Sequence, residues 1–208
     1  MLSEEIESMG PKDIKEIVLS MKESSEGVYR LLENLLEWSR IRLGKVNFII
    51  EKINLKARIS ECVELLGALS RNKGIMITVN VADELIVFTD RNMLDTILRN
   101  LISNAIKFTP SGGTIVVKSE RKTDGSVEIK VIDSGIGMNE EMINNLFLLT
   151  SNTGRKGTAG ETSSGLGLLL CKEFLDINGG KIWVESEVGK GSTFFFTVPE
   201  HETLNAKR

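Results

Sequence analysis

Residues 90–110 read DRNMLDTILRNLISNAIKFTP and decide the fold, because they combine a core-facing helix with polar residues that an ordinary core helix lacks. The apolar residues of this stretch recur at helical spacing and predict one buried face. Asn100, Asn104 and Lys107 are four and three residues apart, so they share one stripe of the helix surface. Asparagine is a poor helix former in a helix interior, because its amide competes for backbone hydrogen bonds. The stripe indicates either a polar site on a rigid element or an ordinary solvated face.

The composition fits one good-sized domain with an appendage. The chain has 208 residues, of which 41% are apolar, which is enough to bury a core. Its net charge of −3 comes from 26 basic and 29 acidic residues mixed along the chain, so nothing in the charge favours a nucleic acid partner. The chain has no apolar run of membrane-helix length and an acidic N-terminus unlike a signal peptide. We therefore expect a cytoplasmic protein.

The cysteines and the single histidine limit the chemistry. Cys62 and Cys171 both lie among apolar residues at helical spacing, so we expect two small buried side chains without a disulfide, in a reducing cytoplasm. The only histidine, His201, follows Pro199 in a polar tail. This position excludes a histidine-based catalytic or metal site in the folded body.

A long helix is predicted from Pro11 to about Leu43. Proline is favourable at the first position of a helix, and the residues that follow repeat in steps of four and three. An apolar stripe of this kind needs a second helix, either in another chain or in a part of the protein that this sequence does not contain. Packing on the domain's own core is the alternative. The stripe consists of Ile14, Val18, Met21, Ser25, Val28, Leu32, Leu35, Ser39 and Arg42.

The rest of the chain mixes one-sided strands with helices. Alternating apolar residues and turn residues predict the strands, and apolar spacing of three and four predicts the helices. This mixture favours an α+β fold, a two-layer sandwich. The expected strands are 48–54, 75–81, 85–89, 114–121, 126–132, 181–186 and 193–198, and the expected helices are 55–71, 90–110, 140–148 and 165–178.

Two glycine-rich motifs follow the central hairpin. The first, D-S-G-I-G from Asp133, puts a carboxylate at the end of an apolar strand, where it can accept a hydrogen bond from a ligand amine. A plain turn is the alternative. The second, residues 151–167, ends where a helix begins, and its amides together with Arg155 and Lys156 suit a phosphate. A flexible linker is the alternative, and the spacing is not that of a Walker loop.

Taken in order, four motifs resemble the boxes of the histidine-kinase catalytic domain, which belongs to the superfamily of gyrase, the MutL proteins and the heat-shock chaperone ATPases. The asparagine helix resembles the N box, and the D-S-G-I-G, G-L-G and G-K-G-S-T motifs resemble the three glycine boxes. The resemblance covers about residues 48–199. It implies a Bergerat-type ATP-binding fold, with a mixed sheet covered on one face by helices and preceded by a long N-terminal helix.

The resemblance also implies roles for individual residues. Asp133 would bind the adenine amino group, Asn104 would ligate Mg²⁺, and Asn100 and Lys107 would contact the ATP phosphates. Mg²⁺ usually keeps several waters and needs few protein ligands. The other residues implied in nucleotide binding are Gly135, Gly137, Gly165, Leu166, Gly167, Gly189, Gly191 and Thr193.

The segment between the first two glycine boxes departs from the family. Phe147 is the expected aromatic anchor, but Leu148 or Leu149 stands where a second aromatic is usual. Arg155 and Lys156 would belong to the lid over the nucleotide.

The position of Asn100 favours a kinase. Gyrase-like ATPases have a glutamate there that activates water, and a neutral amide cannot accept a proton at physiological pH. We expect phosphoryl transfer to a protein side chain by positioning and charge neutralisation. A water-hydrolysing ATPase and a nucleotide-binding module without kinase activity remain alternatives, and a serine kinase on this scaffold is disfavoured.

The helix LLENLLEWSR, residues 31–40, resembles the second helix of a kinase dimerisation hairpin. The implied domains are therefore 1–45, a partial dimerisation domain without its acceptor histidine, 46–199, the catalytic domain, and 200–208, a tail or linker. The implied partners are the helix that carries the acceptor histidine, a response regulator receiver domain and a second copy of the chain. The sequence leaves open whether the parent protein is anchored in the inner membrane.

Overall fold

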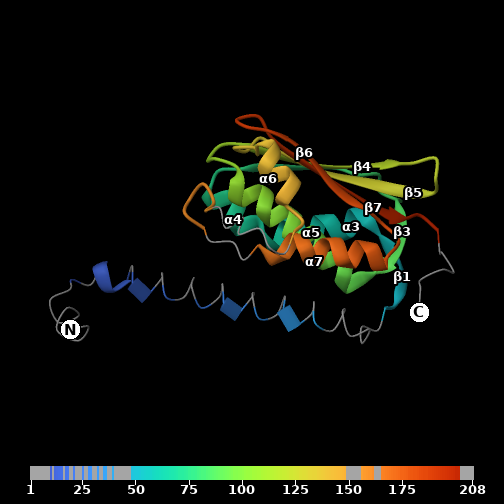
Figure 1. The fold of residues 1–208 in the computed structure, drawn as a ribbon, viewed down its shortest axis with the longest axis horizontal. Coiled ribbons are helices and arrows are strands. Elements are labelled where there is room, and N and C mark those ends of the chain that lie inside the picture. Colours follow the sequence, from blue (N-terminus) through green and yellow to red (C-terminus); the bar gives the residue numbers. More distant parts are fainter. Residues whose placement is uncertain are drawn as a thin grey trace.

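The computed structural model describes residues 48–148, 156–161 and 165–201, together with Gly10 and positions 12–15, 17, 18, 21, 25, 28, 29, 32, 35, 36 and 39. Figure 1 shows a sheet on one side of the folded body and a layer of helices on the other. The expected α+β sandwich is confirmed.

The main sheet has five strands in the order β2-β4-β5-β7-β6. β2 is parallel to β4, and the other neighbours are antiparallel, so the sheet is mixed as expected. A separate antiparallel pair is formed by β1 and β3. The strands are β1 (Ile50–Asn54), β2 (Met76–Asn80), β3 (Ile86–Asp90), β4 (Thr114–Arg121), β5 (Ser126–Asp133), β6 (Ile182–Glu187) and β7 (Gly191–Pro199).

Helices cover one face of this sheet. Alternate residues of β5, Val127, Ile129 and Val131, are fully buried because they face the helices, whereas Ile132 is only half-buried. Phe194 and Phe196 of β7 complete this side of the core. The helices are α3 (Leu55–Leu65), α4 (Gly67–Asn72), α5 (Arg91–Phe108), α6 (Glu140–Asn145) and α7 (Leu166–Ile177).

Helix α5 is the centre of the helical layer. It begins at Asp90, whose carboxylate accepts a hydrogen bond from the Met93 amide at 3.0 Å. It ends before Thr109, whose hydroxyl donates to the Ala105 carbonyl at 2.6 Å. The apolar face predicted from the sequence is buried, which confirms the helical spacing: Leu94, Ile97, Leu98, Leu101, Ile102, Ala105 and Ile106 are at most 3% exposed.

The helix expected over 55–71 is interrupted. Leu66 leaves helical geometry (φ −87°, ψ 0°) and separates α3 from α4. The interruption changes which residues face the core after this point. Gly67 and Ser70 are buried and Leu69 is exposed, although the periodicity predicts Leu69 in the core.

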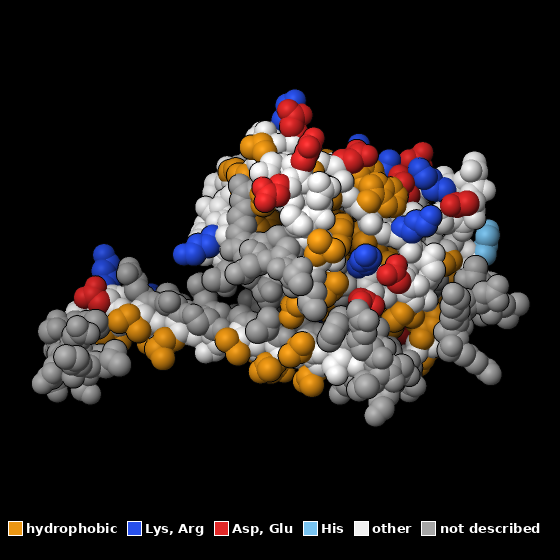
Figure 2. All heavy atoms as spheres, viewed as in Figure 1, with side chains coloured by type: hydrophobic (Ala, Val, Ile, Leu, Met, Phe, Trp, Pro, Cys, Tyr) orange, Lys and Arg blue, Asp and Glu red, His pale blue; other side chains and the backbone are white. Residues whose placement is uncertain are grey.

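The described positions between 12 and 39 have helical backbone, in agreement with the long helix predicted there. The other residues of that helix lie outside the described residues. The stripe residues Ile14, Val18, Met21, Val28 and Leu32 are 42–65% exposed. Figure 2 shows hydrophobic side chains in a row along this segment. In the described structure this apolar stripe is therefore exposed to solvent.

The two cysteines are free and buried, as predicted. Burial raises the pKa of the Cys62 thiol to about 11 and that of the Cys171 thiol to about 12, so neither is a thiolate at neutral pH. In the described part of the chain, no helix has both the length and the apolar composition of a membrane span.

Candidate functional site

The polar stripe of α5 is half-buried. The Asn100 side chain donates from Nδ2 to the Thr96 carbonyl at 2.9 Å, and its Oδ1, which has no hydrogen bond to a described residue, lies against Gly167 of α7. Among the hydrogen bonds of the described residues, none involves the side chain of Asn104. A half-buried amide without a partner usually has a water, an ion or a ligand beside it. Asn104 is therefore available as an oxygen ligand, and Lys107 follows it one turn later.

Asp133 ends β5 as a buried carboxylate, with 6% of the residue exposed. Its Oδ1 accepts hydrogen bonds from the amides of Gly135 at 2.8 Å and Ser192 at 3.2 Å. Burial raises the pKa of Asp133 to about 6, although both amides oppose the shift. Its Oδ2 has no hydrogen bond to any described residue. A buried acceptor held in this way can receive a hydrogen bond from a ligand.

The turn after Asp133 rests on the end of α5. The Ile136 amide donates to the Phe108 carbonyl at 3.1 Å, and a Cβ on Gly135 would lie 2.6 Å from the same oxygen. The Gly189 amide donates to the Ile136 carbonyl at 2.9 Å. The first and third glycine motifs therefore lie together at the C-terminal end of α5, and only glycine permits the close approach at Gly135.

Gly137 has both a left-handed backbone (φ +62°) and no room for a side chain, because a Cβ would overlap the Glu187 carbonyl. We expect Gly137→Ala to lower the free energy of unfolding by about 3 kcal/mol or more, from backbone strain plus overpacking. Gly189 has a similar backbone (φ +81°) and open space around it, so Gly189→Ala should cost only about 1 kcal/mol. Urea unfolding of the two variants measures the difference. Equal losses would show that the overlap at Gly137 is relieved without cost.

Helix α7 begins beside Asn100. Its N-cap, Gly165, has a left-handed backbone (φ +72°) and gives no side-chain cap, so no described side chain caps the first amides of the helix. A Cβ on Gly167 would lie 2.5 Å from Asn100 Oδ1. These amides and the positive end of the helix dipole suit an anion, and they lie next to the polar stripe of α5.

Residues 156–161 lie beside Lys107. The Thr158 amide donates to the Lys107 carbonyl at 3.0 Å, and a Cβ on Gly157 would lie 2.6 Å from Lys107 Cγ. Lys156 is exposed. Arg155, the other basic residue predicted here, lies outside the described residues.

The expected aromatic anchor, Phe147, is half-buried. Its neighbour Leu146 is the residue that packs against the core cluster, and Phe147 is not part of that cluster. The structure therefore attaches this segment to the core through Leu146.

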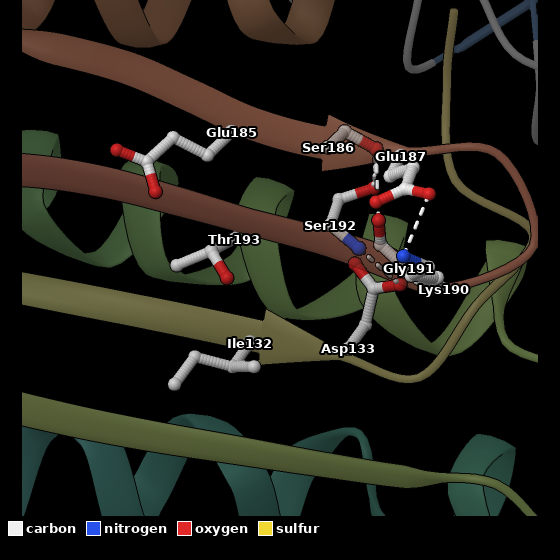
Figure 3. Close-up of a pocket in the computed structure, with 9 residues that line it drawn as sticks. All are labelled: Ile132, Asp133, Glu185, Ser186, Glu187, Lys190, Gly191, Ser192 and Thr193. Atoms are coloured by element: carbon white, nitrogen blue, oxygen red, sulfur yellow. Dashed lines mark hydrogen bonds and ion pairs between the residues drawn. The ribbon is translucent and has the colours of Figure 1, made fainter.

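A cavity of about 330 Å³ lies at the end of β5, β7 and β6. Figure 3 shows residues that line it, among them Asp133, Ser186, Glu187, Lys190, Gly191 and Ser192. Ile132 and Thr193 are paired residues that also line it. Their strand neighbours Val131 and Phe194 are buried on the helical side, so Ile132 and Thr193 face the other side of the sheet.

Thr193 therefore does not lie beside the Asp133 carboxylate, whereas its neighbour Ser192 does. Ser192 pairs directly with Asp133 and is 9% exposed. Sequence reasoning missed Ser192, although the alternation of the strand places it on the same side as the buried Phe194 and Phe196.

The described residues of this site offer a metal ion only one protein ligand. Within the described residues, no group of three or more His, Cys, Asp or Glu side chains could hold an ion. The unpartnered amide oxygen of Asn104 is a suitable single ligand for a hard cation that takes its other ligands from water and phosphate.

The chain matches the family model described as "Histidine kinase-, DNA gyrase B-, and HSP90-like ATPase" over residues 89–202. An adaptive-response sensory kinase, SasA of Prochlorococcus marinus, is 33% identical over 201 residues, which are 96% of this chain and 52% of that protein. The hybrid signal transduction protein dokA of Dictyostelium discoideum is 33% identical over 86% of this chain and 11% of that protein. The chain spans about half or less of the length of these curated relatives.

Among solved structures, the catalytic domain of histidine kinase ThkA is 31% identical, with a TM-score of 0.64 over 74% of this chain and 97% of that domain. Full-length ShkA in complex with AMPPNP is 25% identical, with a TM-score of 0.73 over 89% of this chain and 38% of that one.

Proposed function

The chain belongs to the histidine kinase-, DNA gyrase B- and HSP90-like ATPase family, and from this premise we propose that it is the ATP-binding catalytic part of a two-component sensor histidine kinase. The proposal rests on the observation that three features of the structure lie next to one another. The asparagine stripe of α5 meets the uncapped start of α7 at Asn100 and the turn after the buried Asp133 at Phe108. Together they offer an amine acceptor, an amide oxygen and anion-binding amides.

ATP is the proposed nucleotide. Asp133 Oδ2 accepts the hydrogen bond of the adenine amino group, while Oδ1 stays occupied by the amides of Gly135 and Ser192. The first amides of α7 and the Lys107 ammonium take the phosphates. The complex of ShkA with AMPPNP supports this assignment by similarity.

Asn104 is the proposed protein ligand of Mg²⁺, because its half-buried side chain has no partner among the described residues. When bound, Mg²⁺ supplies charge neutralisation at the phosphates. The residues of the chain orient the γ-phosphate, and the phosphorus then bonds to an imidazole nitrogen as its bond to the β-phosphate oxygen breaks and ADP leaves.

The residue at position 100 supports transfer over hydrolysis. Asn100 has an amide where a hydrolase of this superfamily has a carboxylate base, and its Nδ2 is already engaged with Thr96. A neutral amide cannot remove a proton from water. A water-hydrolysing ATPase and a nucleotide-binding module without kinase activity are the competing functions.

One experiment separates the three. A first dimerisation helix with its acceptor histidine is joined in frame before residue 1, so that it forms a hairpin with residues 1–45 and the histidine has a raised effective concentration at the site. Incubation with Mg·ATP should give acid-labile, base-stable phosphohistidine on the hairpin. Steady release of phosphate without labelling would instead support the hydrolase. Tight ATP binding with neither product would support the binding module.

The acceptor histidine is proposed to lie on a dimerisation helix that this sequence does not contain, because the only histidine, His201, is exposed just after β7. In this proposal, residues 1–45 are the second dimerisation helix, 46–199 the catalytic domain and 200–208 a tail or linker. A response regulator receiver domain would take the phosphate onward. We propose a cytoplasmic location for this catalytic part, either in a cytoplasmic parent protein or in one that is anchored in the inner membrane.

We propose a homodimer through the exposed stripe of the N-terminal helix. Replacing Leu32 and Leu35 together by Glu should convert the dimer to a monomer, because two charges then face the apolar seam. Analytical ultracentrifugation measures the mass. Lys12→Glu, on the face of the same segment away from the stripe, should leave the dimer intact. A wild-type chain that is monomeric at high concentration would contradict this proposal.

A further inference from the structure

We propose that Lys73 is a positioning residue of the nucleotide site, which holds residues 156–161 and the last turn of α5 together and thereby places Lys107. Lys73 lies outside all four motifs, at the end of α4. The inference rests on the proposed function, because Lys107 is assigned there to the phosphates of ATP.

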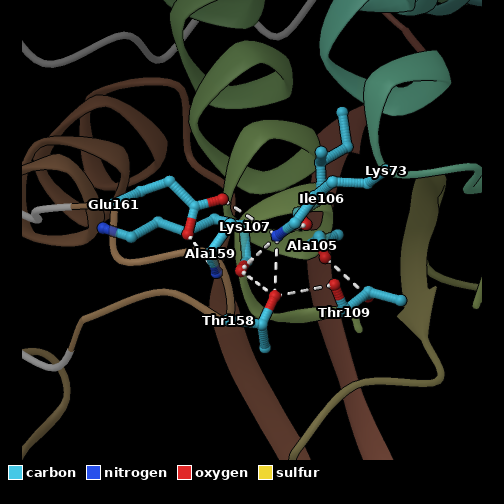
Figure 4. Close-up of polar contacts among 8 residues, drawn as sticks. All are labelled: Lys73, Ala105, Ile106, Lys107, Thr109, Thr158, Ala159 and Glu161. Atoms are coloured by element: carbon cyan, nitrogen blue, oxygen red, sulfur yellow. Dashed lines mark hydrogen bonds and ion pairs between the residues drawn. The ribbon is translucent and has the colours of Figure 1, made fainter. Parts of the chain in front are cut away.

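The Lys73 ammonium joins two segments that are far apart in the sequence (Figure 4). On α5 it donates to the carbonyls of Ile106 at 3.0 Å and Lys107 at 2.9 Å. On the other segment it donates to Thr158 Oγ1 at 2.7 Å and Glu161 Oε1 at 2.9 Å. Its side chain is only 11% exposed. Three ammonium hydrogens shared among four acceptors leave this cation fully engaged.

The position of the charge is favourable for α5. The last carbonyls of a helix have no partner within the helix and carry the negative end of its dipole, so a buried cation there is stabilising. The backbone of Lys73 is also fixed, because its carbonyl accepts from the Gly112 amide at 3.0 Å. Lys73 therefore approaches α5 from a rigid turn.

Glu161 completes the arrangement as a carboxylate. Its Oε1 accepts from Lys73 and its Oε2 from the Ala159 amide at 2.9 Å. Burial alone would raise the pKa of Glu161, but Lys73 and the backbone amides outweigh it and lower the pKa below its usual value. Because the folded pKa is depressed, this stabilisation is present at neutral pH and is lost as the pH falls through the folded pKa.

These contacts help to fix the position of Lys107. Its carbonyl accepts from the Thr158 amide at 3.0 Å and the Thr158 hydroxyl at 3.1 Å, as well as from Lys73. Gly157 packs against the aliphatic part of the Lys107 side chain. Without Lys73, the carboxylate of Glu161 loses its cation and the contact between residues 156–161 and Lys107 is weakened.

The test is a double-mutant cycle on the binding of a non-hydrolysable ATP analogue with Mg²⁺, measured by calorimetry. Lys73→Met keeps the aliphatic stem, and we expect it to weaken binding about tenfold, as is typical for residues that orient a ligand-binding group. In a Lys107→Ala background, Lys73→Met should have almost no further effect, because it acts through Lys107. A purely structural role would give the same fold-loss in both backgrounds and would overturn the proposal.

Lys122→Met is the matched control, because Lys122, in the turn between β4 and β5, pairs with Glu128 of β5 at 3.2 Å and lies outside the motifs. It should bind the analogue like the wild type. Glu161→Gln is a milder second variant, in which binding should weaken about threefold through loss of the charge. Wild-type binding within twofold for both Lys73→Met and Glu161→Gln would refute the inference alone. Absence of analogue binding by the wild type would refute the proposed function.

Discussion

Asp133→Asn should weaken the binding of Mg·ATP by about a hundredfold, the cost of leaving buried polar groups mismatched. The two backbone amides at Oδ1 decide how an asparagine must sit, because they require its carbonyl oxygen in that place. Its NH₂ group then replaces Oδ2 and faces the amino group of adenine. Two donors meet where an acceptor is needed, although the size of the side chain is unchanged.

The same carboxylate predicts a pH dependence. The pKa of Asp133 in the ligand-free protein is about 6 because of burial. Because the pKa of Asp133 is higher in the folded protein than in the unfolded chain, binding of a proton to this carboxylate stabilises the fold. This stabilisation is complete below the unfolded pKa and is lost as the pH rises through about 6. ATP needs the charged form, so wild-type affinity should fall as the pH drops from 8 to 5. The difference in ATP affinity between the wild type and Asp133→Asn should become smaller over the same pH range.

Calorimetry at both pH values tests this prediction. Asp83→Asn is the control, because Asp83 is an exposed carboxylate paired with Lys56, away from the motifs. It should bind ATP like the wild type. An Asp133→Asn variant that folds normally and retains wild-type affinity at pH 8 would remove the adenine contact from the proposal.

Asn104→Ala should reduce phosphoryl transfer to the hairpin histidine by about 10²–10³-fold, because a group that stabilises the reacting phosphate has been removed. Nucleotide affinity should fall less, since Asp133 and the amides of α7 remain. The fold should tolerate the change, because alanine favours helices and the Asn104 side chain has no partner among the described residues. The rate of phosphohistidine formation, measured in single turnover on the joined hairpin, gives the effect.

Asn92→Ala is a matched control on the same helix, where Asn92 is exposed in the first turn of α5. Its transfer rate should equal that of the wild type. Addition of Mn²⁺ gives a second readout, because a change of metal should alter the deficit of Asn104→Ala if this side chain is the ligand. Normal transfer by Asn104→Ala would remove Asn104 from the metal site.

The elements of the fold could be predicted because their patterns are local. The apolar spacing of α5 and the alternation of β5 report directly which side chains share a face. The break at Leu66 could not be predicted, because a continuous apolar pattern runs through it. There the buried Ser70 hydroxyl bonds to the Gly67 carbonyl at 3.1 Å.

Some residues of the site could likewise be predicted from the sequence, and others could not. Asn100, Asn104 and Lys107 share a stripe by helix geometry alone, and Asp133 is recognisable at its strand end. Thr193 was predicted in place of Ser192, because the motif gives the order of residues but not the register of the strand opposite Asp133. In the structure, Ser192 contacts Asp133 across 59 residues of sequence.

Local composition and periodicity are sufficient for the α+β class and the order of the motifs, because each depends on neighbouring residues, and the resemblance to the kinase family adds that Asn100 stands in place of a base. Contacts between distant segments depend on how the whole core packs. The partner of Lys73 is 88 residues away, and no pattern around either Lys73 or Glu161 indicates the other. Their meeting requires α4, α5 and the turn at Gly112 to be in place, so only the folded chain brings this cation to the helix end that carries Lys107.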